Sequence, residues 1–189
     1  TTIKSVLVVG SGLMGSGIAQ VCAQARINVN LHDASRDALD KALRTIDWSV
    51  GKLIEKGALE EEKSVILGRI TAIEDLKAGA DVDLAIEAVF EKKEIKQDIF
   101  KQLDQLCPPR TLFASNTSAI PITELASVTT WQEKFLGLHF FSPVPMMMAV
   151  EVIRGMMTSD ATAHAGQAFV QQIGKEPIMV NRDVAGFVI

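Results

Sequence analysis

The stretch Gly10-Ser11-Gly12-Leu13-Met14-Gly15 decides the fold predicted for this 189-residue chain. It directly follows an apolar run over residues 3–9 and opens a helical pattern of apolar side chains over residues 14–25. A second apolar run follows and ends in Asp33. The order strand, glycine-rich turn, helix, strand and acidic residue is typical of a unit that binds a dinucleotide.

Each position of the glycine-rich turn has a physical task in such a unit. Gly10 makes the tight turn, Gly12 lets a pyrophosphate approach the main chain, and Gly15 lets the helix pack closely on the strand. The phosphates then face the unpaired N–H groups of the first helical turn, where Leu13 and Met14 lie. These five residues are candidate cofactor contacts. Glycines that only make a close-packed turn are the alternative interpretation.

Asp33 selects between the two nicotinamide cofactors. Its carboxylate can accept hydrogen bonds from the adenosine ribose and should repel the extra phosphate of NADP. Arg36 could attract that phosphate, but Asp33 comes first, at the end of the apolar run. We therefore expect NAD as the cofactor.

The composition is that of an ordinary globular protein, with 48% apolar and 22% charged residues. A net charge of −4 without a basic cluster argues against a nucleic-acid partner. The two cysteines, Cys22 and Cys107, lack metal-ligand spacing and favour a reducing compartment. No apolar stretch approaches the length of a membrane span, and the first strand leaves no room for a signal segment. We expect a cytoplasmic protein, or one from the mitochondrial matrix whose transit peptide has been removed.

Strand and helix patterns alternate along the rest of the chain. A long helical pattern over residues 35–67, interrupted at Gly57, predicts a helical hairpin inserted in the nucleotide-binding unit. The alternation predicts an α/β fold of the Rossmann type, a doubly wound and mostly parallel sheet in which the strands around Pro143 and Pro145 could be antiparallel. The further elements expected are strands over 69–73, 82–86, 111–114, 135–141, 150–153 and 177–180, and helices over 91–106, 122–126 and 160–173.

His139 is the first candidate catalytic residue, because ligands of open α/β sheets bind outside the carboxyl ends of the strands. An imidazole there can take a hydroxyl proton while hydride leaves the same carbon. The alternative is a histidine that only packs between Leu138 and Phe140. His32, beside the acidic residue, and His164, on a polar helix face, are weaker candidates.

Glu151 lies in an apolar strand, where burial of an unpaired carboxylate is costly. If the turn from Pro143 to Pro145 folds one strand back on the other, Glu151 can meet His139, fix its ring and stabilise the imidazolium. The alternative is a solvent-facing glutamate on an edge strand.

Two further polar clusters lie at expected strand ends. Residues 115–118 can hold a nicotinamide amide or a substrate oxygen, and equally can cap the following helix. Glu87 and Glu91 flank a strand-to-helix junction that faces the cofactor, while a solvated helix with paired charges explains most of the neighbouring lysines, including Lys96.

Five blocks of sequence resemble those of the L-3-hydroxyacyl-CoA dehydrogenases in order and approximate spacing, over essentially the whole chain. The blocks are Gly10–Ala19, Glu87–Glu91, Ser115–Ser118, Gly137–Pro145 and Glu151–Ile153.

The resemblance implies NAD-dependent oxidation of L-3-hydroxyacyl-CoA to 3-ketoacyl-CoA. It makes His139 the general base and Glu151 its orienting partner, and it gives Ser118 a contact to the substrate oxygen. It also implies cofactor contacts at the nicotinamide end and at the ribose, by Glu91, Lys96, Asn116 and Asp33.

The resemblance also implies a domain organisation. Residues 1–180 form the NAD-binding domain, and residues 181–189 begin the connection to a helical second domain that completes the acyl-CoA site and makes most of a homodimer contact. We therefore expect the chain alone to hold the cofactor with little turnover. The sequence departs from the family at Ser142, Met148 and Ala185, where Asn, Lys and Pro are common.

Two alternative functions stand beside the dehydrogenase. The chain could be a non-catalytic NAD-binding protein, like some crystallin relatives of the family, although the pair His139 and Glu151 disfavours this. It could also be a hydroxy-acid or sugar-acid dehydrogenase with the same fold.

Overall fold

The computed structural model describes residues 2–183. Ala185, and most of the expected connection over residues 181–189, lie outside the described residues.

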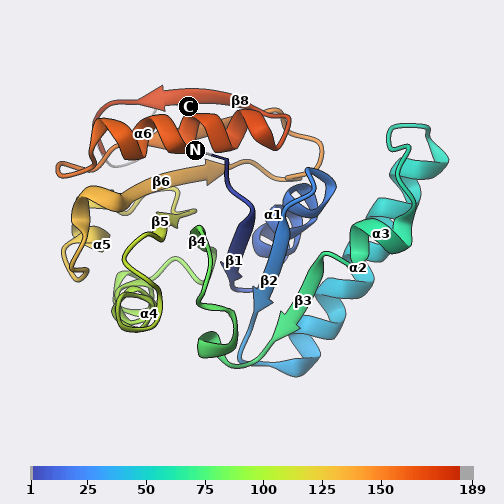
Figure 1. The fold of residues 1–189 in the computed structure, drawn as a ribbon, viewed down its shortest axis with the longest axis horizontal. Helices are drawn as coiled ribbons and strands as arrows, with labels where there is room; N and C mark the ends of the chain where they lie inside the picture. The colour runs from blue at the N-terminus through green and yellow to red at the C-terminus, as the bar shows by residue number, and fades with distance from the viewer. Residues whose placement is uncertain (1, 184–189) are drawn as a thin grey trace.

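The centre of the fold is one eight-stranded sheet in the order β3-β2-β1-β4-β5-β6-β7-β8 (Figure 1). Its first six strands are mutually parallel, β7 is antiparallel to β6, and β8 is parallel to β7. The expected antiparallel pair is thus β6 and β7. The strands are β1 (Ser5–Val9), β2 (Asn28–His32), β3 (Ile70–Ile73), β4 (Leu84–Glu87), β5 (Leu112–Ser115), β6 (Phe135–Phe140), β7 (Ala149–Ile153) and β8 (Glu176–Val180).

Helices cover both faces of the sheet, which confirms the doubly wound architecture. They are α1 (Leu13–Gln24), α2 (Arg36–Glu55), α3 (Lys63–Leu67), α4 (Lys93–Leu106), α5 (Ile122–Ala126) and α6 (Asp160–Gln172), with short 3-10 turns η1 (Leu76–Gly79) and η2 (Gln132–Lys134). Val6 and Val8 of β1 belong to a core with α1, α2 and α6, whereas Leu7 and Val9 belong to a second core with α4 and α5. Because successive strand residues point to opposite faces, a near-continuous apolar strand must be buried on both sides.

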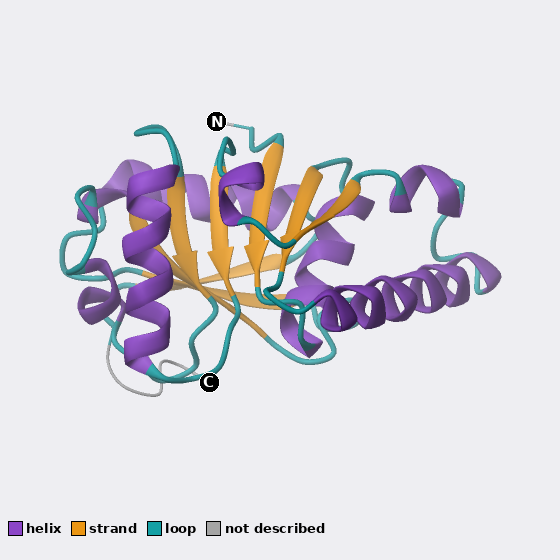
Figure 2. Ribbon diagram, turned by 90° about the horizontal axis from the view of Figure 1, so that it is seen from below, coloured by secondary structure: helices purple, strands orange, loops and turns teal. Residues whose placement is uncertain are grey.

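The helical hairpin projects beyond the strands (Figures 1 and 2). Its first arm, α2, ends just before Gly57, whose φ of +69° suits a residue without a side chain. The second arm, α3, is shorter than the helical pattern predicts. The side chain of Arg69 binds Glu61 at 2.6 Å and the Ala23 carbonyl at 2.9 Å, so the returning chain is tied to α1.

Within residues 2–183, no helix is both long enough and apolar enough to cross a membrane.

Candidate functional site

The glycine turn forms a close-packed cradle between β1 and α1. Gly10 has a φ of +101°, and a Cβ there would lie 2.7 Å from the Ala88 carbonyl oxygen. A Cβ on Gly15 would lie only 1.8 Å from the Gly10 carbonyl oxygen. Both positions therefore require glycine for packing, as the sequence predicts.

Gly12 differs from the other two glycines because an added Cβ would meet no atom within 4 Å. Gly12 also precedes α1 without a side-chain hydrogen bond to the helix start. The first N–H groups of a helix lack intrahelical partners and favour an anion. Open space at Gly12 beside an uncapped helix start is what a pyrophosphate requires, so these residues fit a dinucleotide.

Leu13 and Met14 are the other two candidate cofactor contacts of the turn. Leu13 has an exposed side chain, whereas Met14 packs against the core on the α1 face.

Asp33 lies directly beside this turn. Its Oδ2 accepts hydrogen bonds from the Ser11 amide at 3.0 Å and the Ser11 hydroxyl at 2.8 Å, and its Oδ1 accepts one from the Ser35 amide at 3.0 Å. Partial burial by itself would raise the pKa of Asp33, but these hydrogen bonds outweigh it and lower that pKa. Asp33 is therefore a carboxylate at neutral pH. Sequence reasoning missed Ser11, whose position inside the glycine motif was the available signal.

His139 and Glu151 meet at the centre of the β6–β7 hairpin. They are directly opposite each other in the strand register, and His139 Nδ1 lies 2.6 Å from Glu151 Oε2. Glu151 is fully buried and His139 nearly so. The hydrogen bond predicted across the turn is confirmed. The alternative of a solvent-facing Glu151 is wrong, because β8 pairs with β7 and removes the edge.

This geometry fixes the orientation of the ring. When the Glu151 carboxylate accepts the hydrogen bond, Nδ1 is the donor, and Nε2 is the nitrogen that can take up a further proton. The ring of Phe141 lies 4.6 Å from the imidazole, centroid to centroid, and shields it on one side. The pair can accept a proton at Nε2 and stabilise the resulting charge through Glu151.

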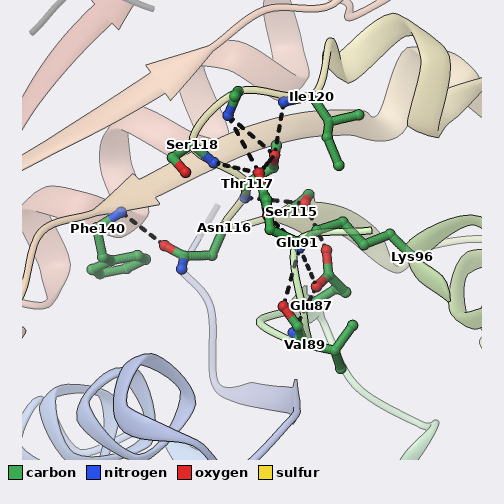
Figure 3. Close-up of polar contacts among 11 residues, drawn as sticks. Glu87, Val89, Glu91, Lys96, Ser115, Asn116, Thr117, Ser118, Ile120 and Phe140 are labelled. Atoms are coloured by element: carbon green, nitrogen blue, oxygen red, sulfur yellow. Dashed lines mark hydrogen bonds and ion pairs between the residues drawn. The ribbon is translucent and has the colours of Figure 1, made fainter. Parts of the chain in front are cut away.

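A buried polar network joins the ends of β4 and β5 to the start of α4 (Figure 3). Glu87 Oε1 accepts hydrogen bonds from Lys96 Nζ and from the Val89 amide, both at 2.7 Å, and its Oε2 accepts one from the Ser115 hydroxyl at 2.6 Å. Lys96 is 1% exposed, so its interpretation as a solvated surface lysine is wrong.

Glu91 forms the outer half of this network. It lies 3.1 Å from Lys96 Nζ and accepts hydrogen bonds from the Thr117 hydroxyl and from the Ser118 amide, the latter at 3.0 Å. Burial would raise the pKa of Glu91, but Thr117 and Lys96 outweigh this and lower it. The network places an ionised and exposed carboxylate at the rim, beside the exposed Ser118.

The loop over residues 115–118 is held by these contacts and not by helix capping. Asn116 Oδ1 accepts a hydrogen bond from the Phe140 amide at 2.9 Å, so the loop is also tied to the strand that carries His139. The alternative that these residues cap the next helix is wrong, because α5 begins after Pro121 without a side-chain cap. The sequence pointed to residues 115–118 as a group, a row of small polar residues after a buried strand, but gave Ser115 and Thr117 no role of their own.

A mostly apolar groove of about 390 Å³ lies between α1, α2 and the β6–β7 loop. The loop side is formed by residues 143–146, immediately beyond the strand that carries His139. On the α2 side, Trp48, Lys52 and Lys56 are exposed. Ser142 and Met148, where the sequence departs from the family pattern, are both exposed near this loop.

Comparisons with known proteins give consistent results. Residues 5–184 match the family described as 3-hydroxyacyl-CoA dehydrogenase, NAD binding domain. A probable 3-hydroxybutyryl-CoA dehydrogenase of Deinococcus radiodurans is 48% identical over 96% of this chain and 65% of its own length. The mitochondrial hydroxyacyl-coenzyme A dehydrogenase of Sus scrofa is 40% identical over 99% of this chain and 62% of its own length.

Solved structures show the same similarity. The crystal structure of an (S)-3-hydroxybutyryl-CoA dehydrogenase from Ralstonia eutropha superposes with a TM-score of 0.95 at 43% identity, covering 100% of this chain and 66% of that one. The chain thus spans about two thirds of the relatives that it matches. It belongs to the NAD-binding domain family of the 3-hydroxyacyl-CoA dehydrogenases.

Proposed function

We propose that this chain is the nucleotide-binding part of an enzyme that oxidises L-3-hydroxyacyl-CoA to 3-ketoacyl-CoA. The observation that carries the proposal is the buried hydrogen bond of His139 to Glu151, near the same edge of the sheet as the glycine turn. The names of the similar proteins from Deinococcus radiodurans and Ralstonia eutropha support the substrate class.

The glycine turn and Asp33 would hold NAD, with the pyrophosphate over Gly12 and the ribose at the Asp33 carboxylate. Bound NAD supplies the acceptor for the hydrogen and electron pair that leave the alcohol carbon. His139 Nε2 takes the hydroxyl proton, and Glu151 stabilises the imidazolium that forms. In the reverse direction, the same imidazolium returns the proton to the substrate oxygen.

The rim network would position the reacting groups. Ser118 is exposed beside Glu91, where its hydroxyl can contact the substrate oxygen. Asn116 accepts a hydrogen bond from the strand that carries His139, so the loop at the nicotinamide side and the base keep a fixed position relative to each other. A fixed distance between base and reacting carbon is a large part of catalysis, because a misplacement of about 1 Å can cost ~10² in rate.

The apolar groove would receive the coenzyme A portion of the substrate. Its walls suit a pantetheine chain, and Lys52 and Lys56 can attract the phosphates. Trp48 offers an exposed aromatic face on which a purine can stack. Trp48 and Trp131 are the two tryptophans of the sequence, and Trp131 precedes the opposite end of β6 from His139.

These tryptophans give a direct binding test. In the Trp131→Phe variant, added coenzyme A should quench or shift the fluorescence of Trp48, whereas in the Trp48→Phe variant the signal of Trp131 should stay constant. An unchanged Trp48 signal at millimolar coenzyme A would reject this location for the substrate.

The parent enzyme would continue into a helical second domain that closes the acyl-CoA site and forms a homodimer. The chain covers about two thirds of the length of its relatives, and this supports the proposed organisation. A role in fatty acid metabolism follows from the substrate class. The cytoplasm is the compartment proposed, with the mitochondrial matrix as the alternative suggested by the name of the pig relative.

The activity test uses the full-length enzyme that carries this chain. We expect oxidation of NADH with acetoacetyl-CoA, much slower oxidation of NADPH, and little reaction with free acetoacetate. Turnover of the free acid at a comparable kcat/KM would favour a hydroxy-acid dehydrogenase, and tight NADH binding without any turnover would favour the non-catalytic alternative.

A further inference from the structure

Lys175 is a buried lysine whose backbone is fixed by the end of α6. Gly174, with a φ of +74°, donates its N–H to the Gln171 carbonyl at 3.0 Å, and Lys175 donates its own to the Val170 carbonyl at 3.0 Å. This pair of hydrogen bonds is the Schellman arrangement, which terminates a helix and satisfies its last carbonyls. The side chain of Lys175 therefore starts from a rigid point.

The ammonium of Lys175 lies under the β6–β7 loop. It donates hydrogen bonds to the carbonyl oxygens of Val144 at 2.6 Å and of Met147 at 2.5 Å. The side chain is 7% exposed, and burial lowers the pKa of Lys175. Within residues 2–183 this ammonium forms no ion pair, and its hydrogen bonds go to these two main-chain carbonyls.

A buried ammonium is a costly way to hold a loop, because its desolvation offsets much of the hydrogen-bond energy. Apolar packing would hold the same loop at lower cost. Unlike apolar packing, the hydrogen bonds of the ammonium are directional. They hold two specific carbonyls, three residues apart, at one position near the end of α6. This favours a role in geometry over a role in stability.

The same loop is fixed on two other sides. Val144 is buried against α1, where a Cβ added to Gly17 would lie 2.8 Å from the Val144 Cβ. The Glu176 amide donates to the Met148 carbonyl at 2.9 Å, next to the ammonium contact. The loop between His139 and Glu151 is thus clamped between the nucleotide-binding helix and the start of β8.

We infer that Lys175 is a positioning residue, which fixes the β6–β7 loop against α1. The fixed loop sets the distance from the glycine turn to two parts of the site, the loop wall of the groove and the His139–Glu151 pair. The inference rests on the proposed function. Lys175 does not touch the substrate or the cofactor in this account. Its effect passes through the main chain of Val144 and Met147.

The test replaces Lys175 in the full-length enzyme. Lys175→Met keeps the length of the apolar stem and removes both hydrogen bonds of Nζ, and Lys175→Gln keeps a donor nitrogen on a shorter side chain. We expect Lys175→Met to raise KM for acetoacetyl-CoA and to lower kcat, each by ~10-fold. Lys175→Gln should fall between parent and Lys175→Met. The Kd for NADH should stay within about twofold, because the cradle itself is unchanged.

Hydrogen exchange gives a readout that does not depend on activity. Met146 and Met147 donate their amides to the Pro143 carbonyl at 2.9 and 3.0 Å, so these amides report directly on the loop. Lys175→Met should speed their exchange by ~10-fold or more, while amides of β1 stay protected. The control is Lys101→Met, on the exposed face of α4, which should change none of these quantities.

Val144→Ala weakens the contact of the same loop with α1. It should likewise raise KM for acetoacetyl-CoA and lower kcat without changing the Kd for NADH, so it can replace the lysine variants if those fail to fold. The inference is overturned if Lys175→Met only lowers thermal stability, or if its NADH affinity falls as much as its acetoacetyl-CoA KM rises. If the parent itself lacks activity with acetoacetyl-CoA, the proposed function fails. Hydrogen exchange of the Met146 and Met147 amides then tests by itself whether Lys175 fixes the loop. Faster exchange then supports the clamp, and unchanged exchange refutes it.

Discussion

The Glu151→Gln variant tests the role of the buried carboxylate most sharply. Glutamine has nearly the same shape and can still accept the hydrogen bond from His139 Nδ1, so the change removes the charge and little else. The carboxylate is fully buried, so bulk water screens this charge little.

The size of the effect follows from the contact distance. With 2.6 Å between His139 Nδ1 and Glu151 Oε2, the centres of the imidazolium and carboxylate charges lie roughly 4 Å apart. Two unit charges at that separation attract by ~4 kcal/mol at an effective dielectric of about 20. The transition state holds only part of the imidazolium charge, and each 1.4 kcal/mol is about tenfold in rate. We therefore expect kcat to fall by ~10², at the lower end of the usual range for general acid–base catalysis.

The assay is steady-state oxidation of NADH with acetoacetyl-CoA by the full-length enzyme, with NADH affinity measured by fluorescence titration. The matched control is Glu94→Gln, on the exposed first turn of α4, which should leave kcat unchanged. Circular dichroism confirms that the variants are folded. If Glu151→Gln keeps kcat within threefold of the parent, the carboxylate charge does not assist the base and the dyad argument fails.

Four further variants test other parts of the account. Gly15→Ala should lose NAD binding and stability together, since its Cβ would overlap the Gly10 carbonyl oxygen, as thermal melts and calorimetry can show. Gly12→Ala should keep its melting temperature while the NAD Kd rises at least ~10-fold, because its methyl enters open space reserved for the pyrophosphate; unchanged affinity would place the phosphates elsewhere. Asp33→Asn should reduce the ratio of NADPH Kd to NADH Kd. It should also make the free energy of unfolding depend less on pH in the acid range. Because the pKa of Asp33 is lower in the folded state than in the unfolded state, its carboxylate stabilises the fold at pH values above the ordinary carboxyl pKa. This stabilisation is lost as the pH falls through the folded-state pKa. Phe100→Ala should cost ~3–5 kcal/mol in denaturant unfolding, since its fully buried ring packs on Phe135 at 4.5 Å; a cost under ~1 kcal/mol would contradict the assigned core.

The nucleotide-binding half was predictable because its signals are local. The glycine spacing, the apolar strand before it and Asp33 after it each follow from backbone sterics and helix-end electrostatics, and the structure places them as expected. The antiparallel hairpin was also within reach, because a buried glutamate needs a partner and the turn after His139 could supply it.

The parts that sequence reasoning missed depend on contacts between distant segments. Lys96 has the pattern of a surface helix, yet it is buried because Glu87 and Glu91 both approach it from the end of β4. Lys175 reads as an ordinary lysine after a helix until the β6–β7 loop folds over it. For residues 115–118 the sequence left a ligand contact and a helix cap equally open, because small hydroxyl side chains suit both, whereas here Ser115 and Thr117 donate to the carboxylates of β4 and its following loop.

The most direct test of the central claim is the His139→Gln variant of the full-length enzyme, assayed at saturating NADH and acetoacetyl-CoA alongside its Kd for NADH. We expect kcat to fall by ~10² or more while the Kd for NADH stays nearly constant, because His139 moves the proton and does not hold the cofactor. A kcat close to that of the parent, or a loss of NADH affinity as large as the loss of turnover, would contradict the assignment of His139 as the base.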